Sequence, residues 1–245
     1  MSRSRFRSTC CRRRVAASGR TSTERCRCVR ASCPPLNTLV RDGLVACRDG
    51  LLGANAVGGS KTNFSLEALR VWATRLYGSR EKEGWERMFS PGARLRRGLT
   101  SINEYIEHYG TGGGLSRPLF AEFLDEAAQA LGSRTLGALG EQYADLGRAS
   151  ELADTALPDD VAPMREAKEL LARRSEHMHS DGPAATEEVR RAWWRLDELA
   201  KEAGAKFPLS DAAAADLRAD LQRRVAALYD GEVRAHDALT KALGD

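Results

Sequence analysis

The stretch LRADLQRRVAALYDGEVRAHDAL, residues 217–239, decides the fold class. Its apolar residues recur every three or four positions, and charged residues fill the positions between them. This spacing is that of an amphipathic α-helix with one buried face. The buried face would consist of Leu217, Leu221, Val225, Leu228, Ala235 and Leu239. The pattern predicts a long terminal helix.

Apolar stripes of the same period run through the chain from Leu36 onward. They fall within residues 66–77, 95–109, 119–131, 136–157, 161–171 and 189–203. Glycine or proline breaks separate them, and we find no alternating β-branched run with hairpin turns. The sequence therefore predicts an all-α, multi-helix bundle with a disordered N-terminal tail and a long C-terminal helix pair.

Residues 1–35 differ from the rest in composition. They hold ten arginines, one acid (Glu24), no lysine, and five of the six cysteines. Their charge of +9 within an overall +4 leaves −5 for the body, which is not the basic balance of a nucleic-acid binder. The segment fits a disordered tail, an arm for anionic partners, or a zinc site, although its cysteine spacing matches no strong zinc pattern. Its composition also fits GC-rich DNA read from a wrong start or in a shifted frame, and this interpretation is favoured.

The body divides at the sequence HSDGPA, residues 179–184. We expect a helical bundle with a glycine-rich loop over residues 36–180 and a helix pair over 181–245. The pair would pack on the bundle or stand apart as a hairpin for a partner. Core packing is the usual outcome for helices of this length.

The glycine-rich loop is YGTGGGLSRPLF, residues 109–120. Its spacing fits neither the dinucleotide fingerprint nor the phosphate loop of nucleotide hydrolases, because Leu115 stands where the fingerprint needs glycine and no Lys-Ser/Thr pair follows. The neighbouring stripes place it between two helices, with Ser116 as a possible N-cap and Pro118 in the first turn.

Two interpretations of this loop remain open. Backbone N–H groups at the helix start, together with Arg117, would suit a phosphate or carboxylate, and His108 beside them would suit proton transfer. Alternatively, the glycines form a corner at which two helices pack closely. The candidate substrate-binding residues are Glu107, His108, Thr111, Gly112, Gly113, Gly114 and Arg117.

Other chemistry is not indicated. No Ser/His/Asp order or zinc-protease motif is present, so we expect no catalytic residue, no metal and no cofactor. Cys47 reads as a core thiol, and His177 and His179 read as solvated side chains. No apolar run is long enough to span a membrane, and no secretory signal is present, which favours a cytoplasmic protein.

Three segments resemble a known family. They are GWERMF (84–89), GLTSINEYIEHYGTGGGLSRPLFAEFLDEAA (98–128) and LGALGEQYADLGRASELADTALPDD (136–160). Together they resemble the helical C-terminal domain, of unknown function, in proteins related to butirosin biosynthesis protein H. The resemblance covers about residues 36–205. The matching positions are Trp85, Glu107, Gly112–Gly114, Arg117, Phe120-Ala121 and Leu157-Pro158.

The resemblance implies a place in bacterial specialised metabolism, in antibiotic biosynthesis. The named member is an acyltransferase that moves an amino-acyl group from an acyl carrier protein to an aminoglycoside amine. Its N-terminal half supplies a cysteine nucleophile, which has no counterpart here. We therefore expect a helical substrate-binding part that is inactive alone, with a carrier protein, a separate cysteine-bearing domain or a small molecule as partner. The alternative is a structural or interaction bundle without a ligand site.

Overall fold

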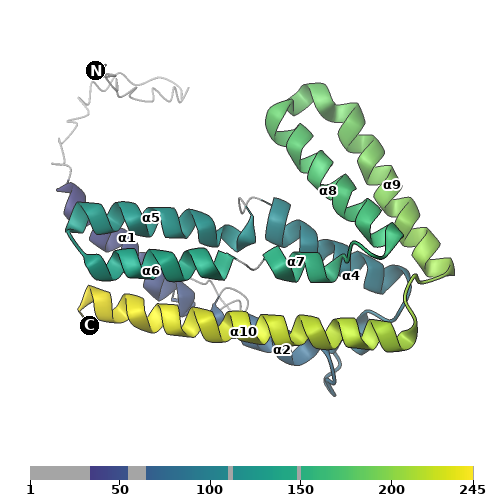
Figure 1. Ribbon diagram of the computed structural model, residues 1–245, viewed down its shortest axis with the longest axis horizontal. Coiled ribbons are helices and arrows are strands. Elements are labelled where there is room, and N and C mark those ends of the chain that lie inside the picture. Colours follow the sequence, from purple (N-terminus) through teal and green to yellow (C-terminus); the bar gives the residue numbers. More distant parts are fainter. Residues whose placement is uncertain (1–33, 55–64, 110–112, 148–149, 245) are drawn as a thin grey trace, which may run out of the picture. The chain divides into compact units, whose positions relative to one another are not determined.

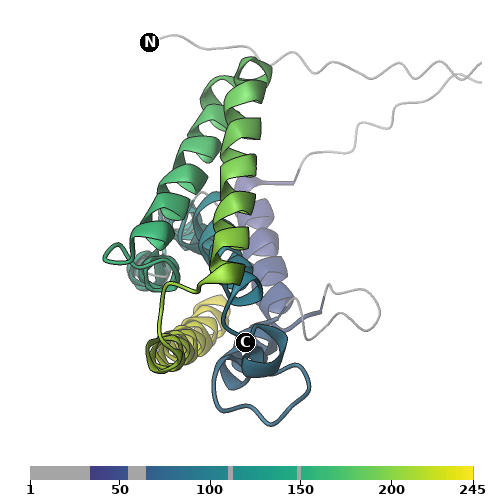
Figure 2. The same ribbon diagram turned by 90° about the vertical axis from the view of Figure 1, so that its right-hand side faces the viewer.

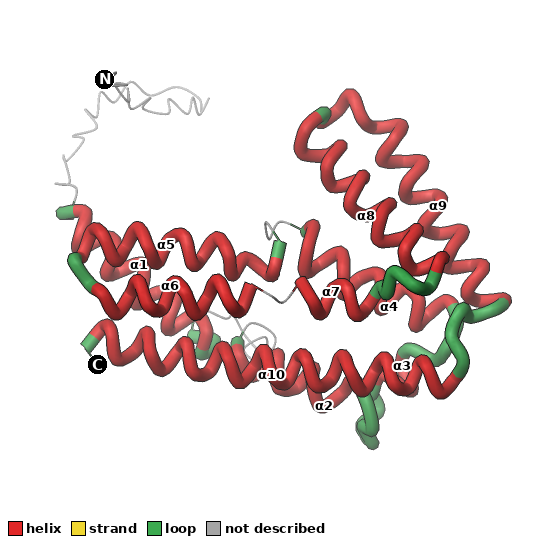
Figure 3. Tube along the Cα trace, in the orientation of Figure 1, coloured by secondary structure: helices red, strands yellow, loops and turns green. Residues whose placement is uncertain are grey.

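The computed structural model describes residues 34–54, 65–109, 113–147 and 150–244. These residues are mainly α-helical, and no strand occurs among them (Figure 3). The prediction of an all-α fold is confirmed. The tail prediction falls on residues 1–33, outside the described residues. Pro34–Asp245 form one compact unit, so the division into 36–180 and 181–245 stays a prediction.

The helices follow the apolar stripes of the sequence (Figure 1). A π-helical turn, Glu104–His108, continues α4, and a 3₁₀ turn, Gly114–Ser116, precedes α5. The helices are α1 (Leu36–Leu51), α2 (Leu66–Leu76), α3 (Trp85–Met88), α4 (Ala93–Asn103), α5 (Arg117–Leu131), α6 (Arg134–Leu146), α7 (Ser150–Ala156), α8 (Ala162–Ser180), α9 (Thr186–Ala205) and α10 (Asp211–Leu243).

Helices α5 and α6 form a tight antiparallel pair. Gly132 ends α5 in the left-handed conformation, and the Ser133 hydroxyl accepts a hydrogen bond from the Leu136 N–H to cap α6. At Gly140 an added Cβ would lie 3.3 Å from the Ala121 carbonyl oxygen of α5, so the absence of a side chain favours this close approach. The pair packs with α1 and the C-terminal half of α10 around one apolar core. This core includes Leu44, Leu124, Leu139, Tyr143 and Leu239.

A second apolar core lies among α2, α4, α7, α8 and the N-terminal half of α10. It includes Leu76, Leu99, Leu157, Leu171, Leu221 and Val225, all below one tenth exposed. Helix α10 contributes to both cores, because its stripe residues Leu221 and Val225 belong to this one and Ala235 and Leu239 to the other. The stretch that predicts the fold class thus joins the two cores.

Polar side chains of α10 fix its packing against α2. The Gln222 amide donates hydrogen bonds to the carbonyls of Ala73 and Tyr77, each at 3.0 Å. These carbonyls lie at the C-terminal end of α2, where backbone acceptors lack partners within the helix. Arg218 likewise donates to the Phe89 carbonyl at 2.8 Å, just after α3.

Helices α8 and α9 lie side by side (Figures 1 and 2). A 3₁₀ turn, Gly182–Ala185, connects them at the break predicted from HSDGPA. Arg195 of α9 binds Glu166 of α8 through both carboxylate oxygens, at 2.6 and 3.0 Å. Helix α9 also packs on α4, whereas α10 packs on α1, α2, α6 and α7. The two C-terminal helices therefore pack on the bundle through different neighbours.

Candidate functional site

The glycine-rich loop makes a left-handed turn between the π-helical turn and α5. Gly113, Gly114, Leu115 and Ser116 all have positive φ, at 85°, 53°, 56° and 64°. Side chains disfavour this region, at roughly 1–2 kcal/mol per residue. Leu115 and Ser116 are the two residues other than glycine with positive φ in the described part of the chain. Backbone strain of this kind persists where packing of the surrounding structure fixes the residues in that conformation.

Gly114 is required by space as well as by conformation. A Cβ added there would lie 2.6 Å from the Gly147 carbonyl oxygen, at the end of α6. Pro118 packs against the same region, 3.1 Å from an added Cβ at Gly147. This part of the loop is a close contact between backbones. The geometry agrees with the interpretation of the glycines as a packing corner, and it places Arg117 at the first position of α5.

The Arg117 side chain is largely buried, and its ion-pair partner lies 115 residues later in the chain. Its Nε donates to Glu232 Oε1 of α10 at 2.6 Å, and its Nη1 donates to the Leu115 carbonyl at 3.0 Å. The side chains of Arg117 and Glu232 are 14% and 2% exposed. The ion pair neutralises the positive charge of Arg117, which the sequence suggests as a contact for an anionic ligand.

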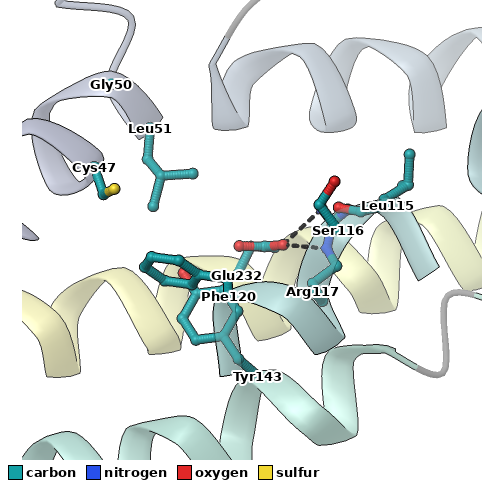
Figure 4. A pocket seen from close by; sticks show the side chains of 9 residues that line it. All are labelled: Cys47, Gly50, Leu51, Leu115, Ser116, Arg117, Phe120, Tyr143 and Glu232. Atoms are coloured by element: carbon teal, nitrogen blue, oxygen red, sulfur yellow. Dashed lines mark hydrogen bonds and ion pairs between the residues drawn. The ribbon is translucent and has the colours of Figure 1, made fainter. Parts of the chain in front are cut away.

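A hollow of about 300 Å³ opens beside this ion pair (Figure 4). Its walls come from α1, the left-handed turn, α5, α6 and α10. The lining residues are Cys47, Gly50, Leu51, Leu115, Ser116, Arg117, Phe120, Tyr143 and Glu232. We call it the Glu232 hollow. Apolar side chains surround a small polar centre, which is the usual composition of a small-molecule site.

Two polar atoms at this centre have no hydrogen-bond partner among the described residues. They are Oε2 of Glu232 and the hydroxyl of Tyr143, and both are buried. Burial and the neighbouring Glu232 carboxylate raise the pKa of Tyr143, so its hydroxyl keeps its proton. The Tyr143 hydroxyl lies close enough to the Glu232 carboxylate for the two to interact, although they do not reach the geometry of a normal hydrogen bond. Two buried polar groups beside the hollow, a carboxylate oxygen and a hydroxyl, therefore lack a normal hydrogen bond among the described residues.

Cys47 corrects one interpretation from the sequence. Its side chain is exposed and lines the Glu232 hollow, so it is not a core thiol. Leu44, one turn earlier, carries the buried contact of α1. Partial burial raises the pKa of the Cys47 thiol, which lowers the share of reactive thiolate at neutral pH.

The other predicted residues divide between two places. Glu107 lies beside the loop, with one carboxylate oxygen 3.5 Å from where a Cβ of Gly113 would be. His108 belongs to a charged group formed with Glu107, Arg174 and Glu104, and burial is the main cause of its lowered pKa. Thr111 and Gly112 lie outside the described residues. The structure thus places Arg117, but not His108, in the Glu232 hollow.

Glu232 and Tyr143 were not predicted as site residues. Glu232 lies four residues after Leu228 and three before Ala235, on the buried face of α10. A carboxylate on an apolar face is a signal that sequence reading can detect, because buried charges need a partner. Tyr143 had no such signal, since aromatic residues are ordinary on a core stripe.

Among the described residues, no cluster of histidine, cysteine or acidic side chains suits a metal ion. Within the same residues, no helix has the length and apolar character needed to cross a membrane.

A comparison with protein families matches residues 14–177 to a domain of unknown function, DUF4872. The chain belongs to this family. The DUF4872 match spans more than half of the chain, includes all the predicted loop residues, and begins within the arginine-rich segment. Tyr143 lies inside it and Glu232 beyond it. No curated protein and no solved structure matches the chain.

Proposed function

We propose that this DUF4872 protein binds a small molecule in the Glu232 hollow. The observation that carries the proposal is the pair of buried, unpartnered atoms, Glu232 Oε2 and the Tyr143 hydroxyl. A buried polar group without a partner costs roughly 1–3 kcal/mol. A ligand that supplies hydrogen bonds to both atoms recovers this cost on binding.

The charge balance of the hollow favours a neutral polar group. Arg117 already neutralises Glu232, so a ligand cation or anion would add an uncompensated charge. A hydroxyl or an amide N–H donates to Glu232 Oε2, and an amide carbonyl accepts from Tyr143. The apolar part of such a ligand would lie against Leu51, Leu115 and Phe120.

We further propose that the chain is the helical substrate-binding part of an acyltransferase similar to butirosin biosynthesis protein H. Support comes from the resemblance over residues 84–89, 98–128 and 136–160, and from the polar groups of the hollow beside the matching Arg117. A separate cysteine-bearing domain would supply the nucleophile, and an acyl carrier protein the acyl group. An acylated amine carries both the N–H and the carbonyl that the hollow would bind.

A second candidate is a structural or interaction bundle without a ligand. The contact of Gly114 with the Gly147 carbonyl favours it, because it explains one loop glycine by packing alone. In that case water would pair with Glu232 Oε2 and Tyr143.

Binding measurements on Tyr143→Phe distinguish these proposals. The probes are an aminoglycoside and its N-acylated form, titrated calorimetrically. We expect saturable binding, stronger for the N-acylated form, that Tyr143→Phe weakens about three- to tenfold, as for one lost hydrogen bond. Tyr229→Phe is the control, because Tyr229 lies on α10 but does not line the hollow.

Each failure has a different meaning. If neither probe binds the unaltered protein, the acyltransferase proposal is wrong for this substrate class. If a probe binds equally well to Tyr143→Phe, the Glu232 hollow is not the site. A loss of affinity of the same size in Tyr229→Phe would also mean that the Glu232 hollow is not the site.

A further inference from the structure

A second hollow, of about 420 Å³, lies between α8 and α9. Its charged lining residues are Arg173, Arg174, His177, Glu188, Arg191 and Arg195. We call it the Arg174 hollow. It shares no lining residue with the Glu232 hollow and belongs to different helices. Four arginines and one acid line its wall, and further carboxylates outside the lining pair with two of these arginines, Arg174 and Arg195.

Arg174 is the most buried of these cations. Its side chain is 7% exposed, and its Nη2 pairs with Glu104 of the π-helical turn. The guanidinium also stacks over the Trp193 ring, 5.1 Å from the ring centre. Its other terminal nitrogen, Nη1, is buried and has no hydrogen-bond partner among the described residues. Two contacts thus hold the group in place while one donor nitrogen stays unsatisfied.

Neighbouring carboxylates neutralise some of the remaining charges. Arg191 pairs with Glu188 at 2.8 Å, and Arg195 binds three glutamates, Glu166 among them. His177 contacts Asp181 at 2.9 Å.

Arg173 differs, because it has no ion-pair partner within the described part of the chain. It is exposed and lies next to Arg174 on α8. Among the described residues, the arginine side chains of the hollow with donors that lack a partner are therefore Arg173 and, through Nη1, Arg174.

We propose that the Arg174 hollow binds the anionic group, phosphate or carboxylate, of a small molecule. Nη1 of Arg174 would donate to an oxygen of this group, and Arg173 would supply a second charge contact from the rim. Guanidinium groups suit both anions, because their N–H groups lie in a fixed plane that matches paired oxygens. The stacking on Trp193 and the pair with Glu104 orient Arg174 before the ligand arrives, which reduces the entropy lost on binding.

The experiment is a titration of the full chain with inorganic phosphate and, separately, with acetate, at constant ionic strength. Binding is followed by NMR of the tryptophan indole N–H groups, because Trp193 contacts Arg174. We expect saturable shifts of the Trp193 signal with at least one anion. If phosphate binds more strongly, the anionic group of the ligand is a phosphate ester. If acetate binds more strongly, that group is a carboxylate.

Two variants test the residues. Arg173→Ala should weaken binding by about three- to tenfold, as expected for loss of one charged contact. Arg174→Met should abolish it while keeping a side chain of similar length against Trp193. Arg234→Ala is the matched control, an exposed arginine on α10 that likewise has no ion-pair partner among the described residues.

The proposal is overturned if neither anion gives a saturable shift of the Trp193 signal. It is also overturned if Arg173→Ala binds as tightly as the unaltered protein, or if Arg234→Ala loses as much affinity. If Arg174→Met is unfolded by circular dichroism, the result for Arg173→Ala decides, since that side chain is exposed and its loss leaves the core intact.

Discussion

Two buried ion pairs organise the two hollows, and they are opposite in polarity. In Arg117–Glu232 the acid is the more buried partner, at 2% exposed against 14%. In Arg174–Glu104 the base is the more buried partner, at 7% against 19%. Each pair leaves one atom of its more buried member without a hydrogen bond among the described residues, Glu232 Oε2 in the first and Arg174 Nη1 in the second.

This difference shows how an ion pair can set the chemistry of a hollow. A free carboxylate oxygen accepts hydrogen bonds, so the Glu232 hollow suits a donor such as a hydroxyl or amide N–H. A free guanidinium nitrogen donates them, so the Arg174 hollow suits an anion. The ligand class depends on which partner is unsatisfied, because the other partner already balances most of the charge.

The largest effect on stability is expected from breaking the Arg117–Glu232 ion pair. Arg117→Met leaves the Glu232 carboxylate buried without its cation, and we expect a loss of about 3–5 kcal/mol in the free energy of unfolding. Arg117→Met combined with Glu232→Leu should recover most of this loss, since the pair is then replaced by apolar side chains. Urea unfolding measures both. A loss below about 1 kcal/mol for the single variant would contradict the importance of the pair.

A smaller loss in the free energy of unfolding is expected from a substitution in the loop that positions Arg117. Gly114→Ala combines a positive φ with a Cβ 2.6 Å from the Gly147 carbonyl oxygen, and should cost about 3 kcal/mol. Gly132→Ala has a similar φ but no atom within 4 Å, and should cost about 1 kcal/mol. Equal losses in thermal or urea unfolding would show that packing against Gly147 contributes nothing.

Ser116 tests the strain of the same turn. Its φ is 64° and its side chain makes no capping hydrogen bond, so Ser116→Gly should raise the free energy of unfolding by about 1 kcal/mol. Ser133→Gly is the comparison, because Ser133 caps α6 and its loss should cost about 0.3 kcal/mol. Destabilisation by Ser116→Gly would mean that the serine has a contact that offsets the strain.

The smallest expected effect concerns the Arg174–Glu104 ion pair, and the pKa of His108 measures it. Burial lowers its pKa from 6.5, Arg174 lowers it further, and Glu107 and Glu104 oppose the shift. Well above pH 6.5 the histidine is neutral in both folded and unfolded chains and does not change the free energy of unfolding. As the pH falls below 6.5, the unfolded chain binds the proton first, so stability decreases until the pH passes the lowered pKa of the folded state.

NMR titration of His108 checks this expectation. Arg174→Gln should raise the pKa of His108, because a nearby positive charge is removed. Glu104→Gln should lower it, because a nearby negative charge is removed. The same direction in both variants would contradict the placement of His108 beside this ion pair.

The fold was more predictable than the sites. Helical periodicity identified the stripes of α4, α5, α6, α9 and α10, because a buried helix face repeats every 3.6 residues whatever it packs against. Pro118 was correctly expected in the first turn of α5. The left-handed conformation of Leu115 was not predictable, since nothing in a leucine indicates positive φ.

Site residues were predictable only in part. Arg117 was found from its place beside the glycines, but its partner Glu232 is 115 positions away. His108 was grouped with Arg117 because they are close in sequence, whereas the π-helical turn places it in the charged group with Arg174. The amphipathic segment around Cys47 predicts a core thiol, but the structure shows that this segment buries Leu44 instead.

The sequence by itself determined that this protein is all-α and where most of its helices run, because hydrophobic period and glycine or proline breaks are local properties. The tertiary structure decided which helices meet. It brought Arg117 to Glu232 and Arg174 to Glu104, pairs separated by 115 and 70 positions. A periodic pattern states which face of a helix is buried, but not which neighbour covers it. The unsatisfied atoms that define both hollows depend on those neighbours.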